Sequence, residues 1–223
     1  MKKTFPKRVL IFCAVILPVL AVLFFLTTWY GVIPFPAYEA EHFGFSDLIS
    51  ENDRDGDGID DYADFVKGAR AFVATKPEYK SEYYEGGYPP EGIGVCTDVI
   101  WSAFEEAGYD LRQMVAEDIA SDPVAYGIEY PDPNIDFRRV VNLDIFFARN
   151  AESLTTSLRH PSDFMPGDIL IYEHHIVLLS DQRNLFGYPL IIHHGGMYDY
   201  ETNGIARNKI LAHYRFSGTG ESN

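Results

Sequence analysis

One cysteine lies where a glycine-rich run becomes a helical pattern, in the stretch GIGVCTDVI. Cys96 would begin that helix, where unpaired backbone N–H groups and the helix dipole lower the pKa of a thiol. The same N–H groups can hold a developing oxyanion. Burial is the alternative, because cysteine is among the residues most often found inside proteins, and Val95 and Val99 are apolar. The position therefore predicts either a nucleophile or a core residue.

Two histidine pairs follow, one before the apolar run IVLLSD and one after PLII. A thiolate nucleophile needs a base within hydrogen-bond reach, and that base needs an orienting group. If the two runs pair as a hairpin, His175 at the start of one lies opposite the end of the other, near His193 and His194. A zinc site made by the histidines and Cys96 is the second interpretation, because the spacing HH-x17-HH is not a familiar zinc pattern.

The acidic stretch ENDRDGDGIDDYAD has the spacing of an EF-hand calcium loop, with Gly58 at the sharp turn. The expected ligands are Asp53, Asp55, Asp57, Ile59 through its carbonyl group, Asp61 and Asp64. Carboxylates this close repel one another unless a cation lies between them. Asp64 is one methylene shorter than the usual glutamate, which leaves Ca²⁺ or Mg²⁺ open, and an ion-free acidic helix start is the alternative. We expect a structural Ca²⁺ and no organic cofactor.

Two adjacent arginines, Arg138 and Arg139, occur in the motif IDFRRV. Arginine can clamp a substrate carboxylate through two parallel hydrogen bonds. The same side chains could instead pair structurally with Asp132, Asp136 or Asp144. We expect a structural pairing for at least one of them.

The order of local patterns predicts the fold class. Apolar spacing of three and four residues predicts helices over residues 45–52, 60–75, 96–107, 110–119 and 140–151. Short apolar runs between turn signals then predict strands in DILIYE, HIVLLSD, PLIIHH and KILAHYRF. Helices followed by strands indicate an α+β domain with an antiparallel sheet.

The N-terminal segment has a different composition from the rest of the chain. Four basic residues precede Val9–Leu26, eighteen residues without a charge that also contain Cys13. Such a segment predicts a single-pass membrane anchor with the following domain outside the cytoplasm. A cleaved signal peptide, giving a secreted or periplasmic protein, is the alternative, although no clean small-x-small cleavage site follows.

The remaining chain is strongly acidic. Four of the 18 basic residues precede the apolar segment and none of the 33 acidic residues does, which leaves a net charge of −19 after it. This charge argues against a nucleic-acid partner, for which a basic surface is expected. It is compatible with bound cations or simply with solubility.

The ordered set of motifs resembles a known group of enzymes. Tyr-x-x-Gly-Gly from Tyr83, the helix-starting cysteine, Pro166–Asp168 and the two histidine-bearing strands resemble NlpC/P60 cysteine peptidases, which have a papain-like fold. More closely, GVCTDV, DPNIDFRRVVNL, PGDILIYEHHIVLLSD and LIIHHGG resemble the bacterial domain-of-unknown-function family 1287, from about Phe65 to Phe216. One departure is Thr-Asp after the cysteine, where NlpC/P60 enzymes usually have Ser-Gly.

This resemblance implies roles for individual residues. Cys96 would be the nucleophile and His175 the general base, with His193 as the orienting residue and His194 as the alternative for that role. Tyr83 and the Cys96 N–H group would line the oxyanion site. The implied chemistry is amide hydrolysis through a thioester, with cell-wall peptidoglycan peptides as the expected substrate of an endopeptidase or amidase.

We therefore expect an anchor over residues 1–31, a linker over 32–44, a helix–loop–helix with the calcium loop over 45–75, a catalytic domain over 76–217 and a flexible tail over 218–223. Two other functions are compatible with the same residues. One is a non-catalytic envelope-binding module, and the other is a transferase that passes the acyl group to an acceptor other than water.

Overall fold

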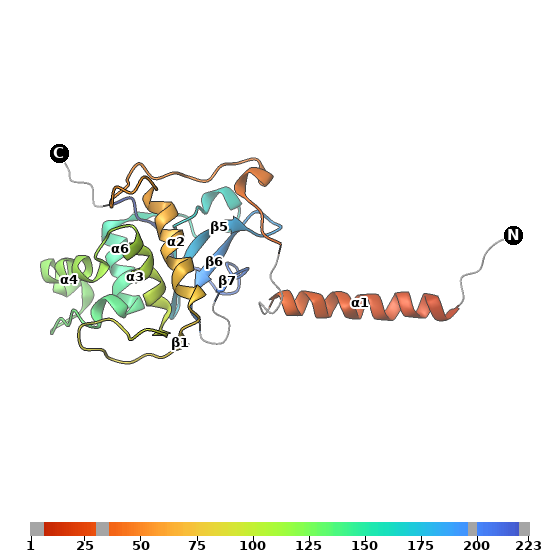
Figure 1. Cartoon of the computed structure of the whole chain (residues 1–223), viewed down its shortest axis with the longest axis horizontal. Coiled ribbons are helices and arrows are strands. Elements are labelled where there is room, and N and C mark those ends of the chain that lie inside the picture. The colour runs from red at the N-terminus through yellow and green to blue at the C-terminus, as the bar shows by residue number, and fades with distance from the viewer. Residues whose placement is uncertain (1–6, 30–35, 196–199, 219–223) are drawn as a thin grey trace. The chain divides into compact units, whose positions relative to one another are not determined.

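A computed structural model describes residues 7–29, 36–195 and 200–218 (Figure 1). The chain divides into two compact units, Met1–Phe35 and Pro36–Asn223. The expected tail beyond residue 218 and residues 32–35 of the expected linker lie outside the described residues. The described start of the second unit packs on the sheet, because Tyr38 forms an isolated antiparallel bridge with Arg183.

The first unit contains helix α1, Lys7–Trp29, which includes Pro18. This helix covers the segment for which the sequence predicted a membrane anchor. Within the described ranges, no helix combines the length and the apolar character needed to cross a membrane. The anchor is therefore not confirmed.

The second unit is a mixed α+β domain. Its helices are α2 (Asp61–Ala74), α3 (Cys96–Glu106), α4 (Leu111–Ser121), α5 (Pro123–Tyr126) and α6 (Val140–Asn150), with short 3-10 turns η1 (Ala40–Phe43), η2 (Asp136–Arg138) and η3 (Pro161–Asp163). Helices α2 and α3 pack closely, with the rings of Phe65 and Phe104 stacked at 4.7 Å between centroids. Gly68 permits this approach, since a Cβ atom there would lie 2.4 Å from the Ser102 carbonyl oxygen.

Six strands form the main antiparallel sheet. In spatial order they are β3 (Glu152–Ser153), β8 (Ala212–Arg215), β4 (Ile169–Tyr172), β5 (His175–Arg183), β6 (Pro189–His193) and β7 (Tyr200–Thr202). The sequence predicted an antiparallel sheet and four of these strands, but neither β3 nor β7. The last strand in the chain, β8, lies inside the sheet between β3 and β4. A separate parallel pair joins β1 (Glu78–Tyr79) to β2 (Ile93–Gly94), directly before α3.

Both faces of the main sheet are apolar, which explains the nearly continuous apolar runs in its strands. One face, with Ile176 and Leu178, packs in the core that includes α2 and α3. The other face, with Val177 and Leu179, packs against Phe164 and the segment containing Ile205. Neighbouring strand residues thus belong to different cores, as the two-residue period of a strand requires.

The helix predicted over residues 45–52 does not form. Tertiary contacts, rather than the local apolar spacing, determine the conformation of this segment. Asp47 pairs with the fully buried Arg183 at 2.5 Å, and the same guanidinium lies over the Phe45 ring. The Ser50 N–H group donates to Asp60, which also caps α2 by accepting from Tyr62. These contacts hold the segment against the domain as an irregular strap.

Candidate active site

Cys96 is the first residue of α3, as the sequence predicted. The preceding Val95 is extended, and its N–H group donates to the Asp98 carboxylate at 2.8 Å, which fixes the start of the helix. The cysteine is also buried, with 4 % of its surface exposed. The two roles considered for this residue are therefore not exclusive, because the helix start itself lies in the core.

Burial raises the pKa of the Cys96 thiol above its ordinary value. Hydrogen bonds from the backbone N–H groups of Ile176, Thr97 and Cys96 act in the opposite direction, while the charge of Asp98 raises the pKa further. The lowered pKa expected from the helix start is thus wrong in its net direction, because loss of solvent outweighs the N–H groups. The Ile176 contact places the sulfur beside the residue that follows His175.

His175 and His193 are brought together. Nε2 of His175 lies 3.0 Å from Nδ1 of His193, and the two rings are nearly perpendicular. The strand register explains this pairing, since Leu178 lies opposite Ile192 in the β5–β6 ladder. Extending that register puts His193 opposite Val177, on the same face of the sheet as His175.

His194 points to the other face. It is fully buried, and its ring lies 5.0 Å from the Tyr79 ring and 6.2 Å from the Phe72 ring, measured between centroids. The structure therefore pairs His193, rather than His194, with His175. The side chain of His174, which precedes the proposed base, is 90 % exposed at the β4–β5 turn.

Tyr83 lies on the surface, with 57 % of its area exposed, and its hydroxyl accepts a hydrogen bond from Asn134. Its neighbour Tyr84 is turned inward. The Arg138 guanidinium lies 5.1 Å from the centre of the Tyr84 ring, and the Tyr84 hydroxyl is buried without a hydrogen-bond partner among the described residues. The inward tyrosine of this loop is thus Tyr84, which the sequence motif did not single out.

Arg138 has a structural role. It forms two hydrogen bonds to the Asp98 carboxylate, at 2.7 and 2.8 Å, and both side chains are almost fully buried. Thr97 donates to the Arg138 carbonyl group, so the Thr-Asp pair that departs from the NlpC/P60 pattern ties η2 to the start of α3. The partner is Asp98 and none of the three aspartates considered from sequence. Arg139 is half exposed and lies 3.7 Å from Asp136.

Asp168 of the Pro-Gly-Asp motif is also structural. It is fully buried, and its carboxylate accepts hydrogen bonds from Nε and Nη2 of Arg215, at 2.7 and 2.8 Å. His213 lies 2.9 Å from the same carboxylate and 2.8 Å from the Thr155 carbonyl oxygen. This group joins β8 to the start of β4.

A cavity of about 550 Å³ opens beside His175. Its lining residues are Tyr172, Glu173, His174, His175, Asn208, Lys209 and Leu211. A second cavity of about 420 Å³ shares four of these residues and extends to Arg139, Val140 and Val141. Asn208 and Lys209 come from the β7–β8 connection, where no sequence motif marked them.

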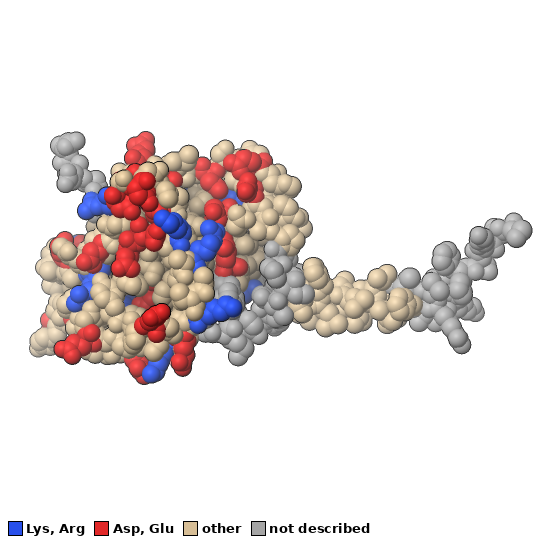
Figure 2. All heavy atoms as spheres, in the orientation of Figure 1, with Lys and Arg blue, Asp and Glu red and all other residues tan. Residues whose placement is uncertain are grey.

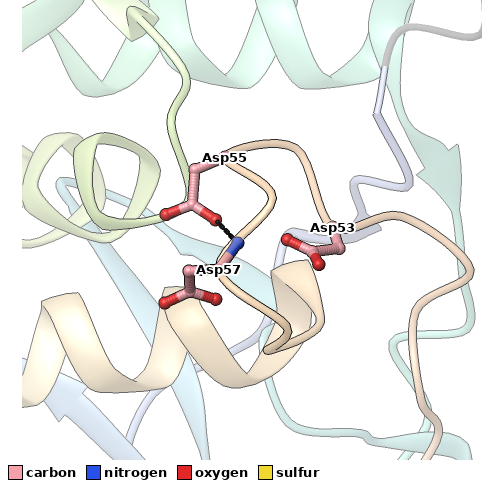
Figure 3. A group of neighbouring side chains, drawn as sticks. All are labelled: Asp53, Asp55 and Asp57. Carbon is pink, nitrogen blue, oxygen red and sulfur yellow. Dashed lines mark hydrogen bonds between the residues drawn. The ribbon is translucent and has the colours of Figure 1, made fainter.

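The acidic loop brings three predicted ligands together (Figure 3). Carboxylate oxygens of Asp53, Asp55 and Asp57 lie within 4.8 Å of one another on the exposed surface. Asp53 accepts from the N–H groups of Gly56 and Gly58, and Gly58 has a φ of 93°, which favours glycine. Oxygen atoms in this number and spacing suit a hard cation.

The two other predicted carboxylate ligands, Asp61 and Asp64, are arranged differently. Asp61 turns away, because its carboxylate accepts from the Arg54 N–H group and the Tyr109 hydroxyl. Ile59 donates its N–H group to Asp57. Asp64 is buried, and its burial together with the charges of Asp57 and Asp55 raises its pKa, while Lys67 at 3.5 Å lowers it.

Figure 2 shows many acidic side chains on the face that it draws.

Comparison with known proteins identifies the family. Residues 66–216 match the family described as domain of unknown function (DUF1287), so the chain belongs to that family. It is also 36 % identical over 162 residues to the uncharacterized protein YijF of Escherichia coli strain K12, covering 67 % of this chain and 78 % of YijF. No solved structure matches the chain.

Proposed function

We propose that the domain is a cysteine amide hydrolase with Cys96 as nucleophile, His175 as general base and His193 as the residue that orients the base. One observation carries this proposal: the 3.0 Å contact between His175 and His193 lies at the start of β5, next to the Ile176 N–H group that bonds the Cys96 sulfur. A nucleophile, a base and an orienting group are the set that covalent catalysis by a thiol requires.

The proposed reaction proceeds through a thioester. The Cys96 sulfur attacks the amide carbonyl carbon while its proton passes to His175. The tetrahedral intermediate then collapses, the C–N bond breaks, and the protonated His175 donates to the leaving amine. Water, deprotonated by His175, attacks the thioester, releases the carboxylic acid and returns the proton to the sulfur. Backbone N–H groups at the start of α3 are the proposed oxyanion donors.

The raised pKa of the thiol has a consequence for this mechanism. Because burial keeps the resting sulfur protonated, the proton leaves only when His175 is positioned to receive it. The base is therefore as necessary as the nucleophile. We expect Cys96→Ala and His175→Ala to abolish hydrolysis alike.

The proposed substrate is a peptide with acidic groups, namely a peptidoglycan stem peptide. The two cavities share four lining residues and supply an apolar lining from Val140, Val141 and Leu211; the cationic Lys209 lines one cavity and Arg139 the other. Cations in an otherwise acidic domain are suited to carboxylates. This proposal includes a location outside the cytoplasm, with the N-terminal segment either retained as a membrane tether or cleaved.

The test is incubation of the purified chain with purified peptidoglycan, wild type beside Cys96→Ala, followed by mass spectrometry of the soluble products. The proposal predicts new peptide fragments whose masses show addition of water at a cleaved amide. Equal fragment release by Cys96→Ala would reject the thiol mechanism. Fragments joined to an added amine would instead identify a transferase, and binding without cleavage by the wild type would identify a non-catalytic module.

A zinc hydrolase has less support. Among the described residues, Asp53, Asp55 and Asp57 form the group of possible metal ligands that lie close enough to share an ion. This group contains no histidine or cysteine. His193 and His194 also face opposite sides of the sheet. The thiol mechanism predicts loss of activity on alkylation of Cys96.

We also propose that the acidic loop binds one structural Ca²⁺ through Asp53, Asp55 and Asp57. The three exposed carboxylates, and the raised pKa of Asp64 behind them, support a cation that would offset their repulsion. Calorimetric titration of the chelator-treated protein with Ca²⁺ and Mg²⁺ tests the site and its preference, and heat of binding retained in Asp55→Asn would reject it.

A further inference from the structure

We propose that Thr202 is a positioning residue that completes a hydrogen-bonded chain from His175 through His193. This inference rests on the proposed cysteine chemistry and extends it by one residue on β7. It assigns to Thr202 the task of accepting a hydrogen bond from the His193 N–H group when His175 carries a positive charge.

The contacts run in one line across three strands. His175 Nε2 on β5 lies 3.0 Å from His193 Nδ1 on β6, and His193 Nε2 lies 3.4 Å from Thr202 Oγ1 on β7. In the β6–β7 ladder Ile191 lies opposite Thr202, which puts Thr202 on the face of the sheet that His193 shares. Thr202 is buried, with 6 % of its surface exposed.

The direction of this chain follows from counting protons. When Cys96 gives its proton to Nδ1 of His175, both nitrogens of that ring carry hydrogen and act as donors. Nδ1 of His193 must then accept from His175, so the hydrogen of neutral His193 is on Nε2. That N–H group points toward Thr202, whose hydroxyl oxygen can accept. A valine at this position has the same shape but cannot accept, so it disfavours the thiolate–imidazolium pair.

The charged side chains near the hydrogen-bonded series His175, His193 and Thr202 make contacts of their own. Glu201, next to Thr202, accepts hydrogen bonds from Arg70, which also binds Asp181 of β5. On α3, Asp98 is paired with Arg138. Glu173 and His174 are exposed at the β4–β5 turn, 4.0 Å from each other. The hydroxyl of Thr202 is therefore the group through which we expect a substitution to act.

The experiment measures alkylation of Cys96 and needs no substrate. Iodoacetamide forms a C–S bond and releases iodide after the thiol has lost its proton, so the rate reports formation of the thiolate. Full-length wild type, Thr202→Val and Thr202→Ser are treated between pH 5 and pH 10, and peptide mass spectrometry follows Cys96 separately from Cys13. We expect Thr202→Val to react about three- to tenfold more slowly at neutral pH, the effect of losing one hydrogen bond, and Thr202→Ser to react within about twofold of wild type.

A second measurement keeps the inference testable if Thr202→Val folds poorly. Nitrogen-15 NMR of the wild type, at a pH where His175 is protonated, should show His193 with its hydrogen on Nε2. Hydrogen on Nδ1 of His193, or equal alkylation profiles for folded Thr202→Val and Thr202→Ser, would overturn the proposal. Absence of amide hydrolysis in the wild type, with these profiles as expected, would reject the hydrolase function and leave the hydrogen-bonded chain intact.

Discussion

Asp98 and Arg138 place opposite charges beside the helix start that carries Cys96, and almost no solvent reaches either side chain. A buried ion pair contributes little compared with apolar residues, but removal of one partner leaves an uncompensated charge. The pair therefore makes the position of Cys96, the proposed nucleophile, sensitive to a single substitution two residues away.

We expect Arg138→Met to lower the free energy of unfolding by about 3 to 5 kcal/mol, because the Asp98 carboxylate stays buried without its partner. Chemical denaturation measures this change. Arg139→Met is the matched control, since its side chain is half exposed and its stability effect should stay within about 0.5 kcal/mol. Equal effects of the two substitutions would contradict the structural role of Arg138.

The two adjacent histidines should separate function from stability. His193→Ala is expected to reduce hydrolysis strongly with a small change in melting temperature, because its proposed role is to orient His175 and it is only partly buried. His194→Ala is expected to lower the melting temperature, because it leaves a cavity between Tyr79 and Phe72. Loss of activity in folded His194→Ala with full activity in His193→Ala would assign the orienting role to His194 in place of His193.

At the scale of elements, the contact between α2 and α3 holds Cys96 against the sheet. Gly68→Ala would ordinarily stabilise a helix by up to about 1 kcal/mol. Here we expect the opposite sign, because the new Cβ would lie 2.4 Å from a backbone oxygen and 2.7 Å from the Glu106 Cβ. Thermal unfolding measures the effect, and a raised melting temperature would show that the two helices can separate without loss.

The acidic loop gives a prediction about pH. Burial and nearby Asp57 raise the pKa of Asp64 above 3.8, so without an ion its contribution to stability is present below the unfolded pKa and is lost as pH rises through the folded pKa. Ca²⁺ offsets the charge, so its stabilising effect should be larger at pH 7 than at pH 4. Melting curves with Ca²⁺ and with chelator test this, and equal curves at pH 7 would count against the ion.

Local patterns predicted some elements well and others poorly, for identifiable reasons. The helix at Cys96 and the strands bearing His175 and His193 were confirmed, because their apolar periods are regular and their ends have turn residues. The helix predicted over residues 45–52 was wrong, since contacts with Arg183, more than 130 positions away, decide that segment. Burial of the Cys96 thiol likewise depends on α2 and β5, so its pKa could not be judged from the helix start alone.

For the whole molecule, the order of strands was beyond local prediction. Nothing in KILAHYRF indicates that β8 enters the sheet between β3 and β4, since the pairing depends on distant hydrogen-bonding groups. The connection between β7 and β8 brings Asn208 and Lys209 to the cavity beside His175. The site residues at strand ends, such as His175 and His193, could be predicted from their motifs. Asn208 and Lys209, which lie in a long connection, could not.

In the proposed mechanism, Cys96 forms a covalent bond with its substrate during hydrolysis. The most direct measurement is rapid acid quenching of the full chain during reaction with peptidoglycan fragments, followed by intact-protein mass spectrometry of the wild type and Cys96→Ala. The proposed mechanism predicts an acyl adduct on Cys96 that forms before product and is absent from the variant. Product formation with no adduct on Cys96, or equal product from Cys96→Ala, would contradict it.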